Sequence, residues 1–269
     1  MPIRLLALDL DGTILADLHT IPARTQAAIK AAIKQGVYVT IATGREYDIT
    51  HKFVKMLGLT TPTICCQGGW IYNAHTGETL SREGMSLPLA HQLIDLARAR
   101  HLVLVLCLGG TESYTEAATP ASREVPTQIG ATVLEVSDLK QMITLPPIKG
   151  LIVHPAEEAG ALVVELQTSL NGNLNVFRSH DVLIEVTSPN VSKGHALAIL
   201  ADYYGIPQNE VMAIGDQDND IEMIAWAGVG IAMGNASLGA KAVANYIAPP
   251  VSEEGAAWAI EHFILRGSK

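Results

Sequence analysis

Two carboxylates stand two residues apart where the first apolar run of the chain ends. Asp9 and Asp11 belong to the segment Asp9-Leu10-Asp11-Gly12-Thr13, which follows apolar residues 3–8. Asp-Gly alone is a common turn dipeptide. Two carboxylates held about 4 Å apart, however, repel each other by roughly 4 kcal/mol at an effective dielectric constant of 20. A fold that gathers them therefore needs a cation or a shared proton.

A second acidic segment follows a later apolar run. Residues 211–214 lead into Gly215-Asp216-Gln217-Asp218-Asn219-Asp220, whose acids match the first three ligand positions of an EF-hand calcium loop. The match then fails, because Ile221 stands where that loop needs Gly and Ala227 where it needs a bidentate Glu. A few hard oxygen ligands from two strand ends suit Mg²⁺, which often shares a phosphate oxygen with its substrate. The two segments together favour phosphoryl chemistry.

Two further segments fit a bound phosphate. Thr43-Gly44-Arg45 follows an apolar run and precedes a helical pattern, so a hydroxyl, a backbone N–H and a guanidinium could face an anion at a helix N-terminus. Lys193 opens another helical pattern. Either feature alone is ordinary, since Thr-Gly is often a turn and a lone lysine is usually solvated. The two segments indicate a phosphate site only in combination with the acidic segments.

The elements that must position these residues alternate between strands and helices. We expect strands over residues 3–8, 37–42, 63–66, 211–214 and 229–232, and helices over residues 25–34, 47–57, 195–204, 221–227 and 256–265. Short apolar runs of this kind are typical of parallel strands buried on both faces. Such sheets bind ligands at the carboxyl ends of their strands. The pattern predicts an α/β fold with a parallel-sheet core.

A stretch of different character separates the two halves. It predicts helices over residues 88–100 and 157–170, a strand over 102–107, and a hairpin of strands over 174–177 and 182–186 around Ser179–Asp181. Turn-rich joints bound it near residues 86–88 and 187–190. We expect an α+β domain at residues 84–188, inserted into a discontinuous α/β core of residues 1–83 and 189–269.

The composition excludes some classes of partner. The chain has 269 residues, of which 48% are hydrophobic and 17% charged, and its formal net charge is −9. This balance favours a globular protein and argues against nucleic acid or an anionic membrane surface as partner. The longest apolar run, residues 102–108, is too short to span a membrane. Cys65, Cys66 and Cys107 form no disulfide framework, so we expect a reduced, cytoplasmic chain.

Four motifs in sequence order resemble those of a known family. They are Asp-x-Asp-Gly-Thr at residues 9–13, Ala-Thr-Gly-Arg at 42–45, Ser-Lys-Gly-x-Ala-Leu at 192–197 and Gly-Asp-x-x-Asn-Asp at 215–220. Together they resemble the haloacid dehalogenase-like (HAD) phosphatases, in particular the Cof-type branch with a type IIB cap. The insertion between Arg45 and Lys193 has the size and place of that cap. The resemblance implies a Rossmann-like HAD core with an inserted α+β cap domain.

The resemblance also implies roles for the motif residues. Asp9 would be the nucleophile that forms an aspartyl-phosphate, and Asp11 would protonate the leaving alkoxide and then take a proton from water. Lys193 would act with these two at the reacting phosphoryl group. The substrate phosphate would be bound by Thr43, Gly44, Arg45 and Lys193.

A magnesium ion would complete this site. The resemblance places Mg²⁺ on the carboxylates of Asp9 and Asp216 and on the backbone carbonyl of Asp11, with Asn219 and Asp220 in support. One position departs from the branch, which usually has Asn-Gly-Ala where this chain has Gln67-Gly68-Gly69. The longer amide leaves the role of that position open.

The function expected is the Mg²⁺-dependent hydrolysis of a phosphomonoester of a small metabolite, either a sugar phosphate or a phosphorylated cofactor such as pyridoxal phosphate. Two alternatives remain: a phosphotransferase or phosphomutase that uses the same aspartyl-phosphate, and a phosphometabolite-binding module without turnover. The rest of the substrate would meet the cap, where no single residue is preferred among the polar candidates Glu112, Tyr114, Arg178, His180 and Glu185.

Overall fold

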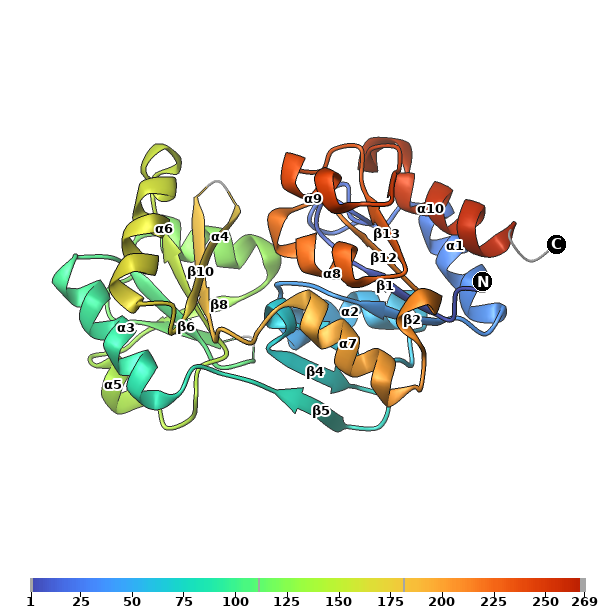
Figure 1. The fold of residues 1–269 in the computed structure, drawn as a ribbon. Coiled ribbons are helices and arrows are strands. Elements are labelled where there is room, and N and C mark those ends of the chain that lie inside the picture. Colours follow the sequence, from blue (N-terminus) through green and yellow to red (C-terminus); the bar gives the residue numbers. More distant parts are fainter. Residues whose placement is uncertain (1, 111, 181, 267–269) are drawn as a thin grey trace. The chain divides into compact units, whose positions relative to one another are not determined.

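The computed structural model describes residues 2–110, 112–180 and 182–266. The chain forms two compact units (Figure 1). The core unit comprises Met1–Arg45, Thr50–Leu80 and Ser192–Lys269, and the inserted unit comprises Glu46–Ile49 and Ser81–Val191. In the described part of the chain, no helix is both long and apolar enough to cross a membrane.

A five-stranded parallel sheet forms the centre of the core unit. Its order is β14-β13-β12-β1-β2, made of Tyr246–Ile247, Val229–Ala232, Val211–Gly215, Leu5–Leu8 and Tyr38–Ile41. Leu8 pairs with Ile214 on one side and with Ile41 on the other. The residues that follow Leu8, Ile41 and Ile214 therefore lie at the same edge of the sheet. The α/β fold class expected from the sequence is confirmed.

Helices bury both faces of this sheet. Along β1, Leu6 and Leu8 belong to one apolar cluster, whereas Leu5 and Ala7 belong to another. The first cluster includes residues of α1 (Ala23–Lys34), α2 (Tyr47–Leu57) and α10 (Gly255–Ile260), and the second includes residues of α7 (Lys193–Tyr203) and α8 (Ile221–Trp226). Helix α9 is Leu238–Val243, and α10 continues as a π-helical turn over Glu261–Leu265. The expected helix over 256–265 therefore changes its hydrogen-bond pattern midway.

A small three-stranded sheet contains the third expected strand. Its order is β3-β4-β5, made of Thr63–Cys65, Trp70–Asn73 and Glu78–Arg82, and β3 and β4 are antiparallel. The residues between β3 and β4 form a short 3₁₀ turn, Cys66–Gly68. This turn contains Gln67, the position that departs from the family motif.

The inserted unit is built on a six-stranded sheet with the order β10-β11-β9-β6-β7-β8. These strands are Asn175–His180, Leu183–Thr187, Lys149–Val153, Leu104–Cys107, Glu112–Thr115 and Thr132–Glu135. Helices α3 (Leu87–Ala99), α5 (Leu139–Met142) and α6 (Ala156–Leu170) contribute to its apolar core, and α4 is Pro120–Ile129. The strand expected around Glu112 and Tyr114 is β7, whereas the sequence did not predict β8, β9, α4 or α5. Asp181, in the expected hairpin turn, lies outside the described residues.

The two faces of the inserted sheet differ in chemistry. Ile152 and Ile184 pair across β9 and β11 and belong to the apolar core. On the opposite face, a row of buried side chains crosses four neighbouring strands: Thr187, Lys149, Cys107 and Ser113. Lys149 Nζ lies 3.4 Å from Glu185 Oε2 and 3.6 Å from Glu46 Oε1. We call these six residues the polar row.

The expected candidates for substrate contact do not all lie on the face of the sheet that carries the polar row. Glu185 belongs to it, whereas Tyr114 packs against the apolar core and Arg178 pairs with Ile184 on that same face. Glu112 is exposed and accepts a hydrogen bond from the Tyr114 hydroxyl. The side chain of His180 lies outside the described residues. Of the candidates, Glu185 is thus the buried ionic one, and its partner Lys149 was not singled out by the sequence.

Candidate active site

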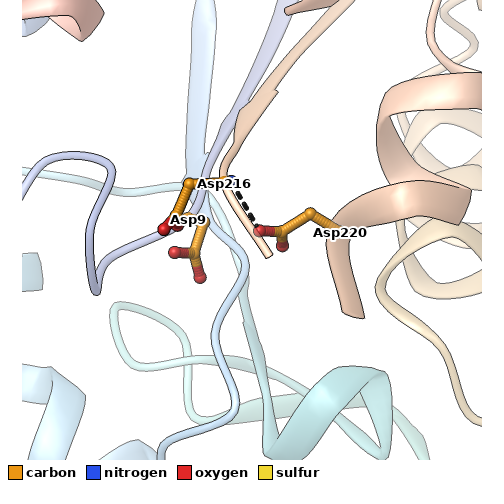
Figure 2. Close-up of side chains that lie close together, drawn as sticks. All are labelled: Asp9, Asp216 and Asp220. Atoms are coloured by element: carbon orange, nitrogen blue, oxygen red, sulfur yellow. Dashed lines mark hydrogen bonds between the residues drawn. The ribbon is translucent and has the colours of Figure 1, made fainter. Parts of the chain in front are cut away.

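Three carboxylates gather at the carboxyl ends of β1 and β12. Asp9, Asp216 and Asp220 each offer an oxygen, and these oxygens lie within 4.8 Å of one another (Figure 2). All three residues are buried. The backbone explains the meeting, because Leu8 pairs with Ile214 and the N–H of Asp9 donates to the Ile214 carbonyl at 3.0 Å. The two acidic segments of the sequence thus form one cluster.

Lys193 enters this cluster from the first residue of α7. Its Nζ donates to Oδ1 of Asp9 and to Oδ1 of Asp220, each at 2.7 Å. Ser192 caps α7 by accepting the His195 N–H, which fixes the start of the helix and so the position of Lys193. Only 1% of Lys193 is exposed, so its charge is neutralised by carboxylates and not by water. The cluster thus contains one ammonium group and three buried carboxylates.

The electrostatics of the cluster show a deficit of positive charge. Burial raises the pKa of Asp9 well above its usual value, Lys193 lowers it in part, and Asp220 and Asp216 raise it further. Burial and then the charge of Asp220 raise the pKa of Asp216 to about 6. Burial alone would lower the pKa of Lys193, but Asp220 and Asp9 raise it overall. Lys193 therefore stays charged while the carboxylates repel each other, and a divalent cation would relieve that repulsion.

The loop after β12 is held in shape by its own acid. Oδ2 of Asp220 accepts the backbone N–H groups of Asp216 and Gln217 at 2.9 and 3.0 Å. Because its Oδ1 accepts from Lys193, both oxygens of Asp220 are engaged. Asp220 therefore shapes the loop and positions the lysine.

Asp216 is oriented by residues that the sequence did not single out for the site. The hydroxyl of Thr13 donates to its Oδ1 at 3.0 Å. Asn235 Nδ2 lies 3.4 Å from its Oδ2 and donates to the Gly12 carbonyl at 2.9 Å. Gly12 has a φ of 79°, and a Cβ there would lie 2.3 Å from Oδ2 of Asp216. The Gly-Thr that ends the first motif is thus required by the close approach of Asp216, a signal present in the sequence.

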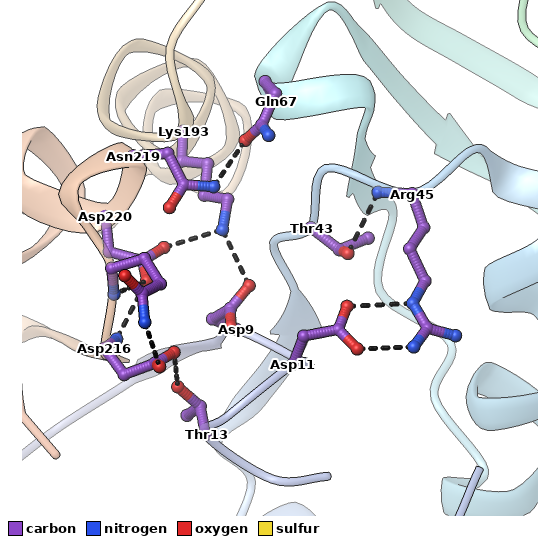
Figure 3. A network of polar contacts seen from close by, with 11 residues as sticks. Asp9, Asp11, Thr13, Thr43, Arg45, Gln67, Lys193, Asp216, Asn219 and Asp220 are labelled. Atoms are coloured by element: carbon purple, nitrogen blue, oxygen red, sulfur yellow. Dashed lines mark hydrogen bonds and ion pairs between the residues drawn. The ribbon is translucent and has the colours of Figure 1, made fainter. Parts of the chain in front are cut away.

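Asp11 and Arg45 form a separate pair. Arg45 Nε donates to Oδ2 of Asp11 at 2.8 Å, and its Nη2 contacts Oδ1 (Figure 3). The Asp11 side chain is 44% exposed, whereas that of Arg45 is 3% exposed. Among the described residues, Arg45 Nη1 is buried without a hydrogen-bond partner. The structure therefore places the side chain of Asp11 with Arg45 and outside the three-carboxylate cluster.

The segment after β2 forms a tight loop next to Gln67. Thr43 is fully buried, and its hydroxyl accepts the Arg45 N–H at 3.1 Å. A Cβ added to Gly44 would lie 2.4 Å from Nε2 of Gln67. Oε1 of Gln67 in turn accepts from Nδ2 of Asn219 at 2.9 Å (Figure 3). The predicted phosphate loop and the loop after β12 are thus bridged by one side chain.

The model of the haloacid dehalogenase-like hydrolases matches residues 6–260. The chain belongs to this family. It is 30% identical over 258 residues to the Bacillus subtilis 5-amino-6-(5-phospho-D-ribitylamino)uracil phosphatase YitU, covering 94% of each chain. It is 30% identical over 267 residues to the Escherichia coli pyridoxal phosphate phosphatase YbhA, covering 92% of this chain and 93% of that one.

A solved structure agrees with this assignment. A haloacid dehalogenase-like hydrolase from Bacteroides thetaiotaomicron superposes with a TM-score of 0.86 at 31% identity, covering 97% of this chain and 99% of that chain. The family resemblance expected from the four motifs is therefore confirmed. The chain is an enzyme of the phosphatase type within the HAD-like hydrolases.

Proposed function

We propose that this HAD-like hydrolase cleaves a phosphomonoester of a small metabolite in a Mg²⁺-dependent reaction, through an aspartyl-phosphate on Asp9. The observation that carries the proposal is the contact of Asp9 with Lys193 inside the buried cluster with Asp216 and Asp220. A nucleophilic carboxylate must meet an anionic phosphoryl group, so it needs positive charge around it. The lysine supplies one such charge.

The donor set fits Mg²⁺. Three carboxylates in close reach with one ammonium leave an excess of negative charge, and hard oxygen atoms are the ligands that Mg²⁺ prefers. Asp9, Asp216 and the backbone carbonyl of Asp11 would hold the ion. Asp220 and Asn219 would support it, because Asp220 already uses both carboxylate oxygens within the protein. When bound, the ion would neutralise the cluster and the phosphoryl oxygens.

The residues would divide the chemistry as follows. A carboxylate oxygen of Asp9 attacks phosphorus, and the bond from phosphorus to the ester oxygen breaks as the new P–O bond forms. The leaving oxygen takes a proton from Asp11, and in the second step Asp11 accepts a proton from the water that attacks the aspartyl-phosphate. That attack releases inorganic phosphate and restores Asp9. Lys193, Thr43 and Gly44 would bind the phosphoryl oxygens, on which charge spreads in the transition state.

Arg45 has a specific place in this scheme. Its guanidinium holds Asp11 by two contacts on the side away from the acidic cluster. Before Asp11 can deliver a proton to the leaving oxygen, its side chain must turn from Arg45 toward the substrate. Arg45 would then be free to donate to the substrate phosphate. We therefore assign Arg45 two partners in turn, the acid and the phosphate.

The relatives and the fold support a proposal for the substrate class. The named relatives are phosphatases for a phosphoribitylamino-uracil and for pyridoxal phosphate. For this chain we propose a small phosphorylated metabolite, either a sugar phosphate or a phosphorylated cofactor. The inserted domain, residues 84–188, would serve as the cap that selects the part of the substrate other than phosphate.

The test is phosphate release from sugar phosphates, pyridoxal phosphate, flavin mononucleotide and an aryl phosphate, each with Mg²⁺ and with a chelator. We expect Mg²⁺-dependent release, with one compound well above the others. Conversion of a sugar phosphate to an isomer with little free phosphate would favour a phosphomutase instead. Tight binding of a compound without any turnover would favour a binding module.

A further inference from the structure

The turn that carries Gln67 has an unusual backbone. Cys66 and Gln67 have φ angles of 52° and 63°, so two successive residues with side chains lie in the left-handed region. Their N–H groups donate hydrogen bonds to the predicted phosphate loop. Cys66 donates to the Arg45 carbonyl and Gln67 to the Thr43 carbonyl, each at 3.0 Å. A strained turn of this kind persists only where the surrounding structure holds it. Here the strain aims the Gln67 side chain into the site.

The side chain of Gln67 meets both halves of the site. Its Oε1 accepts from Asn219, which neighbours Asp220 in the loop beside the acidic cluster. Its Nε2 lies so close to Gly44 that a Cβ there would be 2.4 Å away. The Oδ1 of Asn219 is buried without a hydrogen-bond partner among the described residues. The hydrogen bond to Gln67 is therefore the side-chain contact that orients this asparagine.

The same turn also reaches the lysine. A Cβ on Gly68 would lie 2.3 Å from the backbone oxygen of Ser192, the residue before Lys193. The turn is thus packed between the start of α7 and the loop after β2. An asparagine at position 67 reaches about 1.3 Å less far, because it lacks one methylene. It could not span from Gly44 to Asn219 in the present geometry.

We infer that Gln67 is a positioning residue that couples the phosphate loop at Gly44 to the metal-side loop at Asn219. The inference rests on the proposed function, because it assigns phosphate to one loop and Mg²⁺ to the other. Coupling between two ligand sites is reciprocal. Phosphate should therefore strengthen Mg²⁺ binding through Gln67, in addition to the direct attraction of the two ions.

Three variants separate the parts of this role. Gln67→Gly removes the side chain and suits the left-handed backbone, so a loss of binding would not come from strain. Gln67→Asn keeps an amide that tolerates this backbone but is too short to bridge. Gln67→Glu keeps the length and an acceptor for Asn219, but it places an anionic oxygen near Gly44. The matched control is Asn171→Gly, because Asn171 has a φ of 50° and caps α6 in the inserted unit.

The measurement is calorimetric titration of Mg²⁺ with and without inorganic phosphate, together with the inhibition constant of phosphate and the KM and kcat for an aryl phosphate. For Gln67→Gly and Gln67→Asn we expect the strengthening of Mg²⁺ binding by phosphate to fall about tenfold, as for one lost hydrogen bond near charged groups. Gln67→Glu should raise the phosphate inhibition constant most and leave Mg²⁺ binding without phosphate near the wild-type value. Asn171→Gly should change neither.

The outcomes distinguish this inference from the proposed function. If wild-type protein releases phosphate with Mg²⁺ while the folded Gln67→Gly and Gln67→Asn variants keep the full coupling, the role of Gln67 is refuted and the phosphatase stands. If the wild type binds neither Mg²⁺ nor phosphate and hydrolyses nothing, both ideas fail together. A drop in kcat and thermal stability with unchanged coupling would reduce Gln67 to a structural residue.

Discussion

The core unit and the inserted unit each bury a lysine among carboxylates, but they do so in different ways. Lys193 comes from a helix start and meets acids at strand ends, with contacts of 2.7 Å to Asp9 and Asp220. Lys149 stands on the face of a strand, with Glu185 and Glu46 at 3.4 and 3.6 Å. The first arrangement is short of positive charge and lies where α/β sheets bind ligands. The second is part of a sheet face.

The difference shows what a buried ion pair can mean. Burying charges costs free energy that the mutual attraction often only offsets, so such a pair is weak evidence for a stabilising role by itself. In the core unit the carboxylates outnumber the lysine, and burial raises the pKa of both Asp9 and Asp216. A cation would relieve the repulsion between these carboxylates, so the cluster is suited to bind one. In the polar row, Lys149 contacts its two glutamates at longer distances, and we expect this row to be separable from the chemistry.

The largest effect should come from Asp9→Asn. The variant keeps the shape of the side chain but lacks the nucleophilic oxygen anion, so turnover should fall by a factor of about 10³ or more. The protein should stay folded, because the change removes one charge from a repulsive cluster. Phosphate release and thermal unfolding with a chelator test both points. Turnover within tenfold of the wild type would reject Asp9 as the nucleophile.

The next effect concerns Lys193→Met, which keeps the length of the side chain and removes its charge. Asp9 and Asp220 would lose their ammonium partner inside the protein. Breaking a buried pair in this way costs about 3–5 kcal/mol. Urea unfolding in the presence of a chelator measures the loss. A change below about 1 kcal/mol would mean that the cluster relaxes or takes up protons, so that the lysine is not what holds the carboxylates together.

Several contacts of the core site could be predicted from the sequence because they depend on topology. The meeting of Asp9 and Asp216 could be predicted because strand ends of a parallel sheet converge on one edge, whatever the details of packing. Lys193 lies at a helix start, and it was included because its motif resembles that of the family. The motif order then identified the family. Gly12 and Thr13 carried a readable signal too, because the turn must let Asp216 approach closely. These contacts follow from topology and local turn chemistry.

Other contacts depend on packing between distant segments. The pairing of Asp11 with Arg45 is a choice of side-chain rotamers that spacing does not encode. The bridge from Gln67 to Asn219 requires two successive left-handed residues, one of them a cysteine. In the inserted unit, β9 begins with Lys149 and Gly150, and β8 reads Thr-Val-Leu-Glu, so neither has the apolar pattern of a buried strand. Neighbouring strands decide these elements.

Metal removal and pH should affect the core cluster more moderately. In metal-free protein the pKa of Asp216 is about 6, above the usual 3.8. The folded state thus binds its proton more tightly than the unfolded state. This contribution to stability is present in full below about pH 4 and is lost as the pH rises through about 6. Mg²⁺ binds the ionised form, so it should restore stability above that pH.

Chemical unfolding of the wild type and of Asp216→Asn between pH 4 and pH 8, with a chelator and with Mg²⁺, checks this expectation. The difference between the two proteins isolates Asp216 from the other titrating groups. The variant should lose less stability than the wild type as the pH rises, and it should gain less from Mg²⁺. Parallel curves would show that Asp216 titrates normally and is not a ligand.

The smallest effect should come from Lys149→Met in the polar row. The change leaves Glu185 without its lysine, but the longer contacts and the neighbouring Glu46 imply a weaker pairing than that of Lys193. We expect a loss of about 1–3 kcal/mol in the free energy of unfolding. Adding Glu185→Gln should recover part of it, because the carboxylate that lost its partner is then neutral. Mg²⁺-dependent turnover of an aryl phosphate should stay within about threefold of the wild type, since less than 1 kcal/mol of activation free energy would change. A folded Lys149→Met protein that no longer hydrolyses the aryl phosphate would place the polar row in the catalytic machinery and remove the distinction between the two lysines.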